Sequence, residues 1–183
     1  MDILVYKAKK HDKEAYTQLM LSVGPGLYKV GRGILANDED VADAMQETAL
    51  LGWEKIHTIR YTGYFKTWIT RIMINVCNEM LRKRKRLVVQ EEIPERGMED
   101  WQYANAEWKQ MFMQLDEEAR LLLLLYYAEG FKTREIAQIL EMNENTVRGH
   151  LKKAREKLRQ LYEGSESEKR TTVSGKESED ERV

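Results

Sequence analysis

Residues 132–155 have the sequence Lys132-Thr-Arg-Glu-Ile-Ala-Gln-Ile-Leu-Glu-Met-Asn-Glu-Asn-Thr-Val-Arg-Gly-His-Leu-Lys-Lys-Ala-Arg155. In its first part, apolar residues recur at the spacing of one helix face: Ile136, Ala137, Ile139 and Leu140. Residues 141–143 break this period, and the Asn143 side chain is suited to accept a backbone hydrogen bond at the start of a second helix. The pattern predicts a helix-turn-helix.

The predicted second helix has one apolar face, and its other faces are basic. The inward positions are Val147, Leu151, Ala154, Leu158 and Leu161. The remaining faces carry Arg148, His150, Lys152, Lys153, Arg155 and Lys157. A second helix that presents its first turns to the major groove, with cations beside it for phosphate, is how this motif binds DNA. The sequence therefore favours DNA as a partner, and the alternative is a surface helix with solvated charges.

The composition is that of a soluble, helix-rich chain. Of its 183 residues, 33% are charged and 42% hydrophobic, and no apolar run approaches the roughly 20 residues that a membrane span needs. Residues 1–7 lack the apolar core of a signal peptide, so we expect a cytoplasmic protein without direct membrane insertion. Cys77 lies in an apolar helical pattern and the three histidines are scattered, which predicts a packed thiol and no metal or other cofactor.

Helical periodicity divides the chain into two small all-α domains joined by a flexible linker. In the first domain, residues 1–86, helices are predicted over residues 12–23, 25–35, 38–56 and 65–86, with Pro25 in the first turn of its helix. Pro94 and Gly97 mark the linker, residues 87–98. Helices over residues 99–114 and 116–129 and the helix-turn-helix make up the second domain, residues 99–162. The charged segment 163–183 has little to bury, so we expect a disordered tail there.

The helix predicted over residues 65–86 combines an apolar stripe with polar faces. Trp68, Ile72, Val76 and Met80 recur at helical spacing and are expected to pack inward. The helix ends in Arg82-Lys-Arg-Lys-Arg86, five consecutive cations that suit either a solvated helix C-terminus or nucleic acid. The preceding segment, residues 59–68, mixes aromatic side chains with cations, a combination that suits unstacked bases.

Most of residues 5–162 resembles the extracytoplasmic-function (ECF) sigma factors, the smallest class of bacterial RNA polymerase promoter-specificity subunits. The resemblance rests on Asp40-Val-Ala-Asp-Ala-Met-Gln-Glu-Thr-Ala-Leu-Leu-Gly-Trp53, on Arg60 with Phe65-Lys-Thr-Trp-Ile-Thr-Arg-Ile-Met-Ile-Asn75, on the basic run and on the helix-turn-helix. It implies a four-helix region 2 domain that binds core RNA polymerase and melts the minus-10 element, and a region 4 domain that reads the minus-35 element. The implied partners are the clamp helices of the beta-prime subunit, the flap of the beta subunit, promoter DNA and an anti-sigma factor.

The resemblance also implies roles for individual residues. Contacts with core polymerase are expected from Asp40, Asp43, Gln46 and Glu47, on a helix whose apolar Val41, Met45 and Leu50 should face elsewhere. The loop over residues 58–64 and the helix after it are expected to hold an unpaired minus-10 base, through Arg60, Tyr64, Phe65, Lys66, Thr67, Arg71, Asn75 and Asn78. Minus-35 contacts are expected from Thr133, Glu144, Asn145, Thr146, Arg148, His150, Lys152 and Lys153. The chain departs from the family at Lys132, a usual serine cap, and at Glu141, a usual turn glycine.

Two alternatives stay open. A stand-alone helix-turn-helix transcriptional regulator would use the same motif without needing the acidic helix or the aromatic-cationic loop. An enzyme acting on nucleic acid would need a metal-binding carboxylate set or a nucleophile with its base, and the sequence has neither pattern, so no enzyme is expected. In the free chain we expect the first domain to pack against the second or against an inhibitor, which would hide the basic face.

Overall fold

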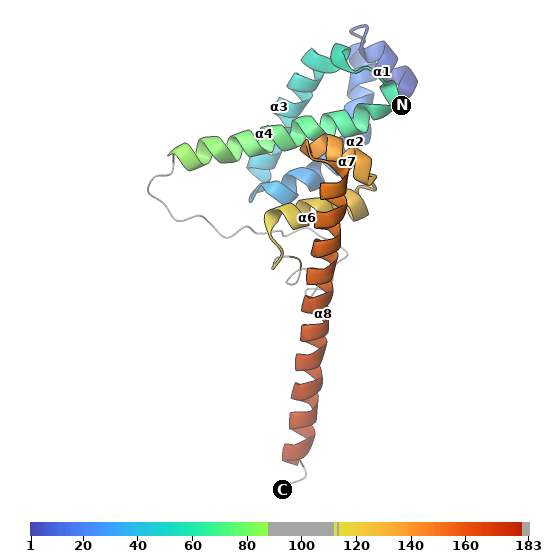
Figure 1. The fold of residues 1–183 in the computed structure, drawn as a ribbon. Coiled ribbons are helices and arrows are strands. Elements are labelled where there is room, and N and C mark those ends of the chain that lie inside the picture. Colours follow the sequence, from blue (N-terminus) through green and yellow to red (C-terminus); the bar gives the residue numbers. More distant parts are fainter. Residues whose placement is uncertain (88–111, 113, 181–183) are drawn as a thin grey trace.

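The structure is a computed structural model that describes residues 1–87, 112 and 114–180, and every regular element in them is a helix (Figure 1), as the sequence predicts. The first domain consists of α1 (Asp2–Ala8), α2 (Lys13–Ile34), α3 (Asp38–Lys55), the short turns η1 (Ile56–Thr58) and η2 (Thr62–Tyr64), and α4 (Phe65–Leu87). The second consists of α6 (Glu117–Leu123), η3 (Leu124–Ala128), α7 (Thr133–Leu140) and α8 (Glu144–Asp180). The predicted linker and most of the helix predicted over residues 99–114 lie outside the described residues.

In the first domain, α2, α3 and α4 pack around one apolar core. Leu19 and Leu27 of α2 and Ile69 and Met73 of α4 are fully buried. A Cβ at Gly31 would lie 2.6 Å from the Met73 Cε, so glycine is what allows α2 to approach α4 this closely. Because burial of each large apolar side chain contributes about 1.5–3 kcal/mol, this core fixes the position of α4.

The N-terminal helix α1 is an element that the sequence analysis did not predict. It is short, but Val5 and Ala8 are completely buried against the rest of the domain. Val5 and Ala8 are three residues apart, which fits one face of a helix, but a helix of seven residues is too short to show a clear helical period. The chain then turns, and the Asp12 carboxylate caps α2 by accepting a hydrogen bond of 3.0 Å from the Ala15 N–H.

The prediction that Pro25 begins a helix is wrong, because α2 runs through it without interruption. A proline inside a helix removes one backbone donor and leaves the carbonyl of the residue four positions earlier without its partner. That residue is Leu21, whose side chain is 73% exposed, so water can reach this part of the helix.

The second domain contains the predicted helix-turn-helix, which is preceded by a helix that ends in a π-helical turn. Asp116 caps α6 through the Ala119 N–H at 2.8 Å, and the five residues of η3 then form a π-helical turn closed by the Glu129 N–H on the Leu124 carbonyl. Leu122, Leu125, Ile136 and Val147 are fully buried and join α6, η3, α7 and α8 into one core. Leu158 and Leu161 of α8 pack against this core partly buried.

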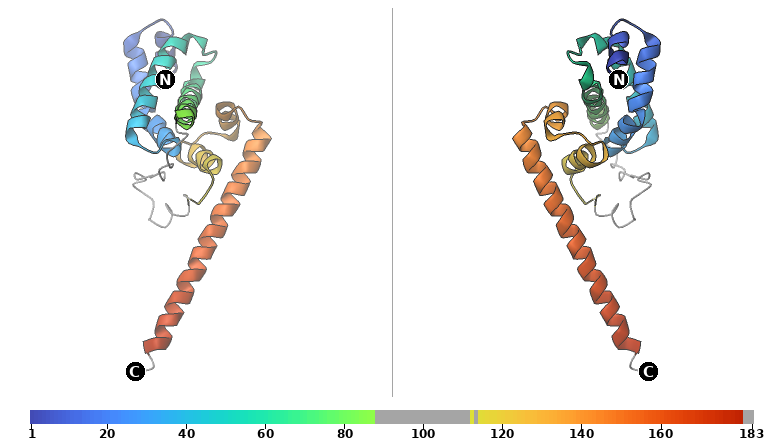
Figure 2. Two further views of the ribbon diagram at one scale, coloured as in Figure 1. Left: turned by 90° about the vertical axis from the view of Figure 1, so that its left-hand side faces the viewer. Right: turned by 90° about the vertical axis from the view of Figure 1, so that its right-hand side faces the viewer.

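The two domains pack on each other, as expected for the free chain, but the expectation that this packing hides the basic face is wrong, because Arg148, Lys152 and Lys153 of α8 stay exposed. α7 lies against α4, and α6 and η3 lie against α2, so residues far apart in sequence share one apolar core (Figure 2). Among the described helices, none is both long enough and apolar enough to cross a lipid bilayer.

The last part of α8 differs from the expected tail. The helix α8 extends from the second domain to Asp180, and Figure 1 shows its end projecting away from both domains. No proline occurs between residues 144 and 180, so no backbone donor is missing from the helical ladder.

Candidate nucleic-acid interface

The turn of the helix-turn-helix forms although it lacks the usual glycine. Glu141 adopts a left-handed conformation with φ of 56°, and the Met142 N–H donates to the Ala137 carbonyl at 2.9 Å to close the end of α7. At the other end of the turn, the Asn143 side chain accepts a hydrogen bond of 2.8 Å from the Asn145 N–H, as predicted. The start of α7 is fixed by the Glu135 carboxylate, which accepts a hydrogen bond of 2.8 Å from the Lys132 N–H.

The first turns of α8 present polar side chains to solvent. Asn145, Thr146, Arg148, Lys152 and Lys153 are all exposed. Glu144 accepts hydrogen bonds from the Thr133 hydroxyl at 2.8 Å and from the Arg148 guanidinium at 2.7 Å, and these two donors lower the pKa of its carboxyl group. Arg148 is therefore paired within its own helix, while its side chain remains 63% exposed. His150 instead lies beside α6, with its Nδ1 2.5 Å from a Glu118 carboxylate oxygen.

Of the eight predicted minus-10 residues, the structure exposes five, buries two and leaves Lys66 partly buried. Arg60, Tyr64, Arg71, Asn75 and Asn78 are exposed, and the last three follow each other at helical spacing along α4. Phe65 is 0% exposed and Thr67 is 6% exposed. The expectation that Phe65 stacks on a base is wrong, because its ring is part of the core where the loop joins α4.

A pocket of about 350 Å³ lies where the loop over residues 58–64, α4 and α7 meet. It is lined by Thr58, Ile59, Arg60, Tyr61, Tyr64, Thr67, Trp68, Arg71, Arg134 and Gln138. Four predicted residues are among them, whereas Asn75 and Asn78 lie outside. Tyr61 was not among the predicted site residues, yet it is 71% exposed and its ring centroid lies 6.2 Å from that of Tyr64. Arg134 and Gln138 were not predicted either, although their spacing of four residues places both on the polar side of α7.

Two cations of α4 are engaged by carboxylates of the second domain. The Lys66 ammonium donates to the Glu129 carbonyl at 2.8 Å, lies 3.3 Å from the Glu129 carboxylate and stands 4.7 Å from the centre of the Phe131 ring. Lys29 of α2 approaches the same carboxylate at 3.8 Å. One turn further along α4, Arg71 forms an ion pair with Glu141 at the helix-turn-helix turn. These contacts define an interdomain latch formed by Lys66, Arg71, Glu129 and Glu141.

The Glu129 side chain is only 7% exposed, so its charge depends on these partners. A Cβ at Gly26 would clash with the Glu129 carboxylate, so the glycine leaves the space that the carboxylate occupies.

Comparison with known proteins matches two separate parts of the chain. Residues 19–87 match the family model of sigma-70 region 2, and residues 106–158 match that of sigma-70, region 4. The chain belongs to the sigma-70 family. Within it, the chain is an ECF sigma factor.

Curated relatives of this sigma factor are similar over most of their length. It is 26% identical to RNA polymerase sigma factor SigV of Bacillus subtilis over 136 residues, which is 72% of this chain and 81% of SigV. It is 22% identical to ECF RNA polymerase sigma factor SigW of the same organism over 174 residues, 85% of this chain and 92% of SigW. ECF RNA polymerase sigma factor SigM of Mycobacterium tuberculosis is 26% identical over 159 residues, 82% of this chain and 78% of SigM.

Two solved structures share the fold of this sigma factor. CnrH, solved in complex with the cytosolic domain of CnrY, gives a TM-score of 0.68 at 24% identity, covering 89% of this chain and 97% of CnrH. The sigma factor RpoE of Bartonella quintana, solved with the anti-sigma factor NepR, gives a TM-score of 0.70 at 23% identity, covering 81% of this chain and 96% of RpoE.

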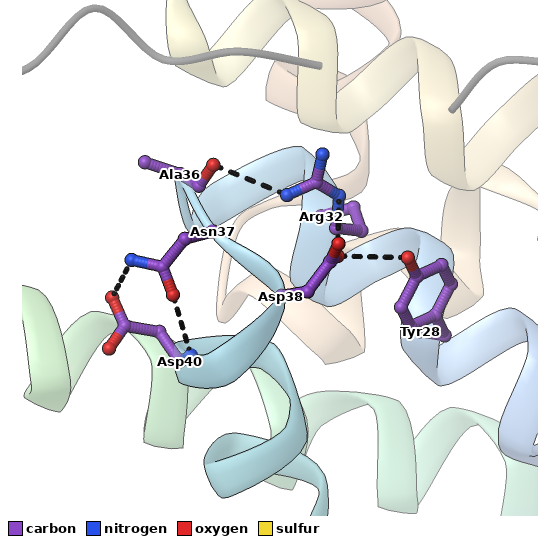
Figure 3. Close-up of polar contacts among 6 residues, drawn as sticks. All are labelled: Tyr28, Arg32, Ala36, Asn37, Asp38 and Asp40. Carbon is purple, nitrogen blue, oxygen red and sulfur yellow. Dashed lines mark hydrogen bonds and ion pairs between the residues drawn. The ribbon is translucent and has the colours of Figure 1, made fainter. Parts of the chain in front are cut away.

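The N-terminal end of α3 in this sigma factor is built from a network of polar contacts (Figure 3). The Asn37 side chain accepts from the Asp40 N–H at 2.7 Å and donates to the Asp40 carboxylate at 2.9 Å. Arg84 of α4 donates to the same carboxylate at 2.7 Å. Asp40, one of the predicted polymerase contacts, is therefore engaged in holding α3 to its own domain.

The other predicted polymerase contacts form a solvent-facing surface on α3. Asp43, Gln46 and Glu47 are all exposed at helical spacing. The expectation that Leu50 faces away from them is wrong, because Leu50 follows on the same face and is 62% exposed. Val41 is buried and Met45 partly buried, as predicted. We call the surface of Asp43, Gln46, Glu47 and Leu50 the α3 face.

Proposed function

We propose that this sigma factor binds core RNA polymerase through the α3 face and directs it to promoters through two DNA-binding elements. The loop over residues 58–64 with the exposed side of α4 would take the minus-10 element. The first turns of α8 would take the minus-35 element. The observation that carries the proposal is that one chain combines an exposed basic recognition helix with a separate pocket of aromatic, hydroxyl and guanidinium groups.

The chemistry of the pocket suits a single unpaired base. Extruding a base from the duplex costs a few kcal/mol in lost stacking and pairing. An aromatic face returns about 1–3 kcal/mol by stacking, and Tyr61 and Tyr64 supply exposed rings. Arg60 adds positive charge for the strand that carries the base, and Arg71 would add its own charge once its ion pair with Glu141 is broken.

A second apolar groove suits the flap of the beta subunit. It has a volume of about 590 Å³ and lies between the end of α6 with η3 and the middle of α8. Its lining is Phe112, Leu123, Tyr127, Ala128, Arg155, Leu158, Arg159 and Tyr162. Apolar walls bordered by two arginines fit an apolar segment with acidic neighbours. We propose this groove as the flap contact of the second domain.

The interdomain latch supports a closed state of the free sigma factor. Lys66 and Arg71 bind Glu129 and Glu141 where they would otherwise meet DNA phosphates. Binding to core polymerase or to an anti-sigma factor would then select how the two domains are arranged. The sigma factor RpoE of Bartonella quintana was solved with the anti-sigma factor NepR. We propose a protein inhibitor of the same kind for this chain, acting in the cytoplasm.

Reconstitution with core polymerase tests the proposal. We expect the purified chain to co-elute with core and to produce promoter-dependent transcripts from a library of candidate promoters, while core alone does not. A stand-alone regulator would instead bind specific duplex DNA by itself and would leave the promoter preference of core unchanged. The α3 face favours the role of a polymerase subunit, because a stand-alone regulator would not need a polymerase-binding surface.

A further inference from the structure

Lys9, just after α1, is bound to Ile59, near the start of the loop over residues 58–64. Its ammonium donates a hydrogen bond of 2.6 Å to the Ile59 backbone carbonyl, 50 residues away in sequence. A charged donor makes this a stronger contact than an ordinary neutral hydrogen bond. The position of Lys9 is itself fixed, because Val5 and Ala8 anchor α1 in the core.

Ile59 is the point from which the exposed part of the loop starts. Its side chain is only 4% exposed, and its N–H donates to the Ile56 carbonyl at 3.2 Å. Its carbonyl accepts the hydrogen bond from Lys9, so both backbone polar groups of Ile59 have a partner. The next buried anchor is Phe65, so the five residues between them form a short bridge that carries Arg60, Tyr61 and Tyr64.

We infer that Lys9 is a positioning residue for promoter melting. The inference rests on the proposed function, because it assumes that this loop receives the minus-10 base. Without the Lys9 contact, the start of the bridge gains conformational freedom, and that freedom must be lost again when a base is bound. Neither α1 nor Lys9 lies within the residues that match sigma-70 region 2.

Lys10 provides a matched control. It lies next to Lys9 and carries the same charge, but its ammonium stands over the Tyr6 ring, 4.4 Å from the ring centre. Lys9→Met and Lys10→Met therefore remove the same charge from the same part of the surface, and only Lys9→Met removes the hydrogen bond to Ile59. Lys9→Arg keeps a charged donor and should restore the wild-type behaviour in large part. Lys9→Leu is a second variant without a side-chain donor, in case Lys9→Met does not fold.

Hydrogen exchange on the free chain measures the positioning directly. We expect Lys9→Met to speed exchange of the amides of residues 60–64 by about tenfold, the scale of one charge-assisted hydrogen bond, while the amides of α2 and α4 are unchanged. Lys10→Met should leave the loop amides as in the wild type. Equal exchange in Lys9→Met and Lys10→Met would overturn the inference.

Promoter opening by the holoenzyme measures the consequence. With Lys9→Met, we expect the rate of conversion from closed to open complex to fall roughly tenfold, with unchanged affinity for core and unchanged closed-complex formation. A loss confined to closed-complex formation, or no loss, contradicts a positioning role. If even the wild-type holoenzyme opens no promoter, the proposed function fails, and the exchange experiment still decides whether Lys9 orders the loop.

Discussion

Lys66 of α4 and Glu129 of the second domain meet through both the backbone and the side chain of the glutamate. The ammonium lies 2.8 Å from the Glu129 carbonyl and 3.3 Å from its carboxylate. The glutamate side chain is almost fully buried, so removing its charge should weaken the contact between the two domains more than removing an exposed charge would.

We expect opening of the interdomain latch to improve DNA binding by the free sigma factor. The double variant Glu129→Gln with Glu141→Gln should bind a single-stranded minus-10 oligonucleotide roughly tenfold more tightly, because Lys66 and Arg71 become available. Fluorescence anisotropy measures this affinity. Glu14→Gln with Glu54→Gln changes the net charge equally at exposed sites and should have a much smaller effect. Similar gains from both pairs would show that net charge alone is responsible.

The α3 face should contribute to polymerase binding without contributing to folding. Replacing Asp43, Gln46 and Glu47 together by alanine is expected to weaken co-elution with core by about tenfold or more, as for a central interface cluster. The melting temperature should stay near the wild-type value because all three side chains are exposed. Glu14→Ala with Gln18→Ala, on the exposed side of α2, serves as the control. Undiminished co-elution of the triple variant would place the polymerase contact elsewhere.

Arg148 and Lys153 should differ in how they affect promoter choice. Arg148→Ala is expected to relax preference at one minus-35 position, because an arginine on a guanine edge is worth about 1–3 kcal/mol of discrimination. Lys153→Ala should weaken all promoters alike and lower the salt slope by about 1. Measuring a panel of single-base promoter variants separates the two effects. Identical profiles for the two variants would contradict this division of roles.

Tyr64 should contribute to promoter opening, whereas Phe65 should contribute to stability. Tyr64→Ala is expected to reduce permanganate-detectable opening at the minus-10 element while closed complexes still form, because a stacking face of about 1–3 kcal/mol is lost. Asn78→Ala should have a smaller effect, since Asn78 does not line the pocket. Phe65→Ala should instead cost about 3–5 kcal/mol of unfolding free energy, as a buried aromatic does. Normal opening with Tyr64→Ala would exclude Tyr64 from the base pocket.

Cys77 should be unreactive in the native protein. Its thiol is fully buried, and burial raises the pKa of Cys77 to about 12 by disfavouring the thiolate. At pH 8, labelling by a thiol reagent should therefore be slow in the folded chain and fast in denaturant. Raising the pH to 9 should leave the native thiol mostly protonated. Fast labelling of the folded chain would contradict this assignment.

The sequence was most informative where one pattern fixes one element. The apolar spacing in residues 136–161 and the cap at Asn143 predicted the helix-turn-helix, because helix period and capping are local properties. Phe65 and Leu50 were assigned to the wrong surroundings, since their burial depends on how whole helices pack. The interdomain latch and the part of the pocket lining that α7 provides could not be predicted, because each brings together residues more than 60 positions apart.

Glu141 affects two equilibria at once: the folding of the second domain and the separation of the two domains. Its left-handed backbone costs the turn about 1 kcal/mol compared with glycine, while its carboxylate binds Arg71 of the other domain. A glycine there would make the second domain harder to unfold and at the same time easier to separate from the first. The thermal stability of the second domain and its readiness to separate from the first therefore rise together at this position, and a more heat-resistant variant would also be a less restrained one.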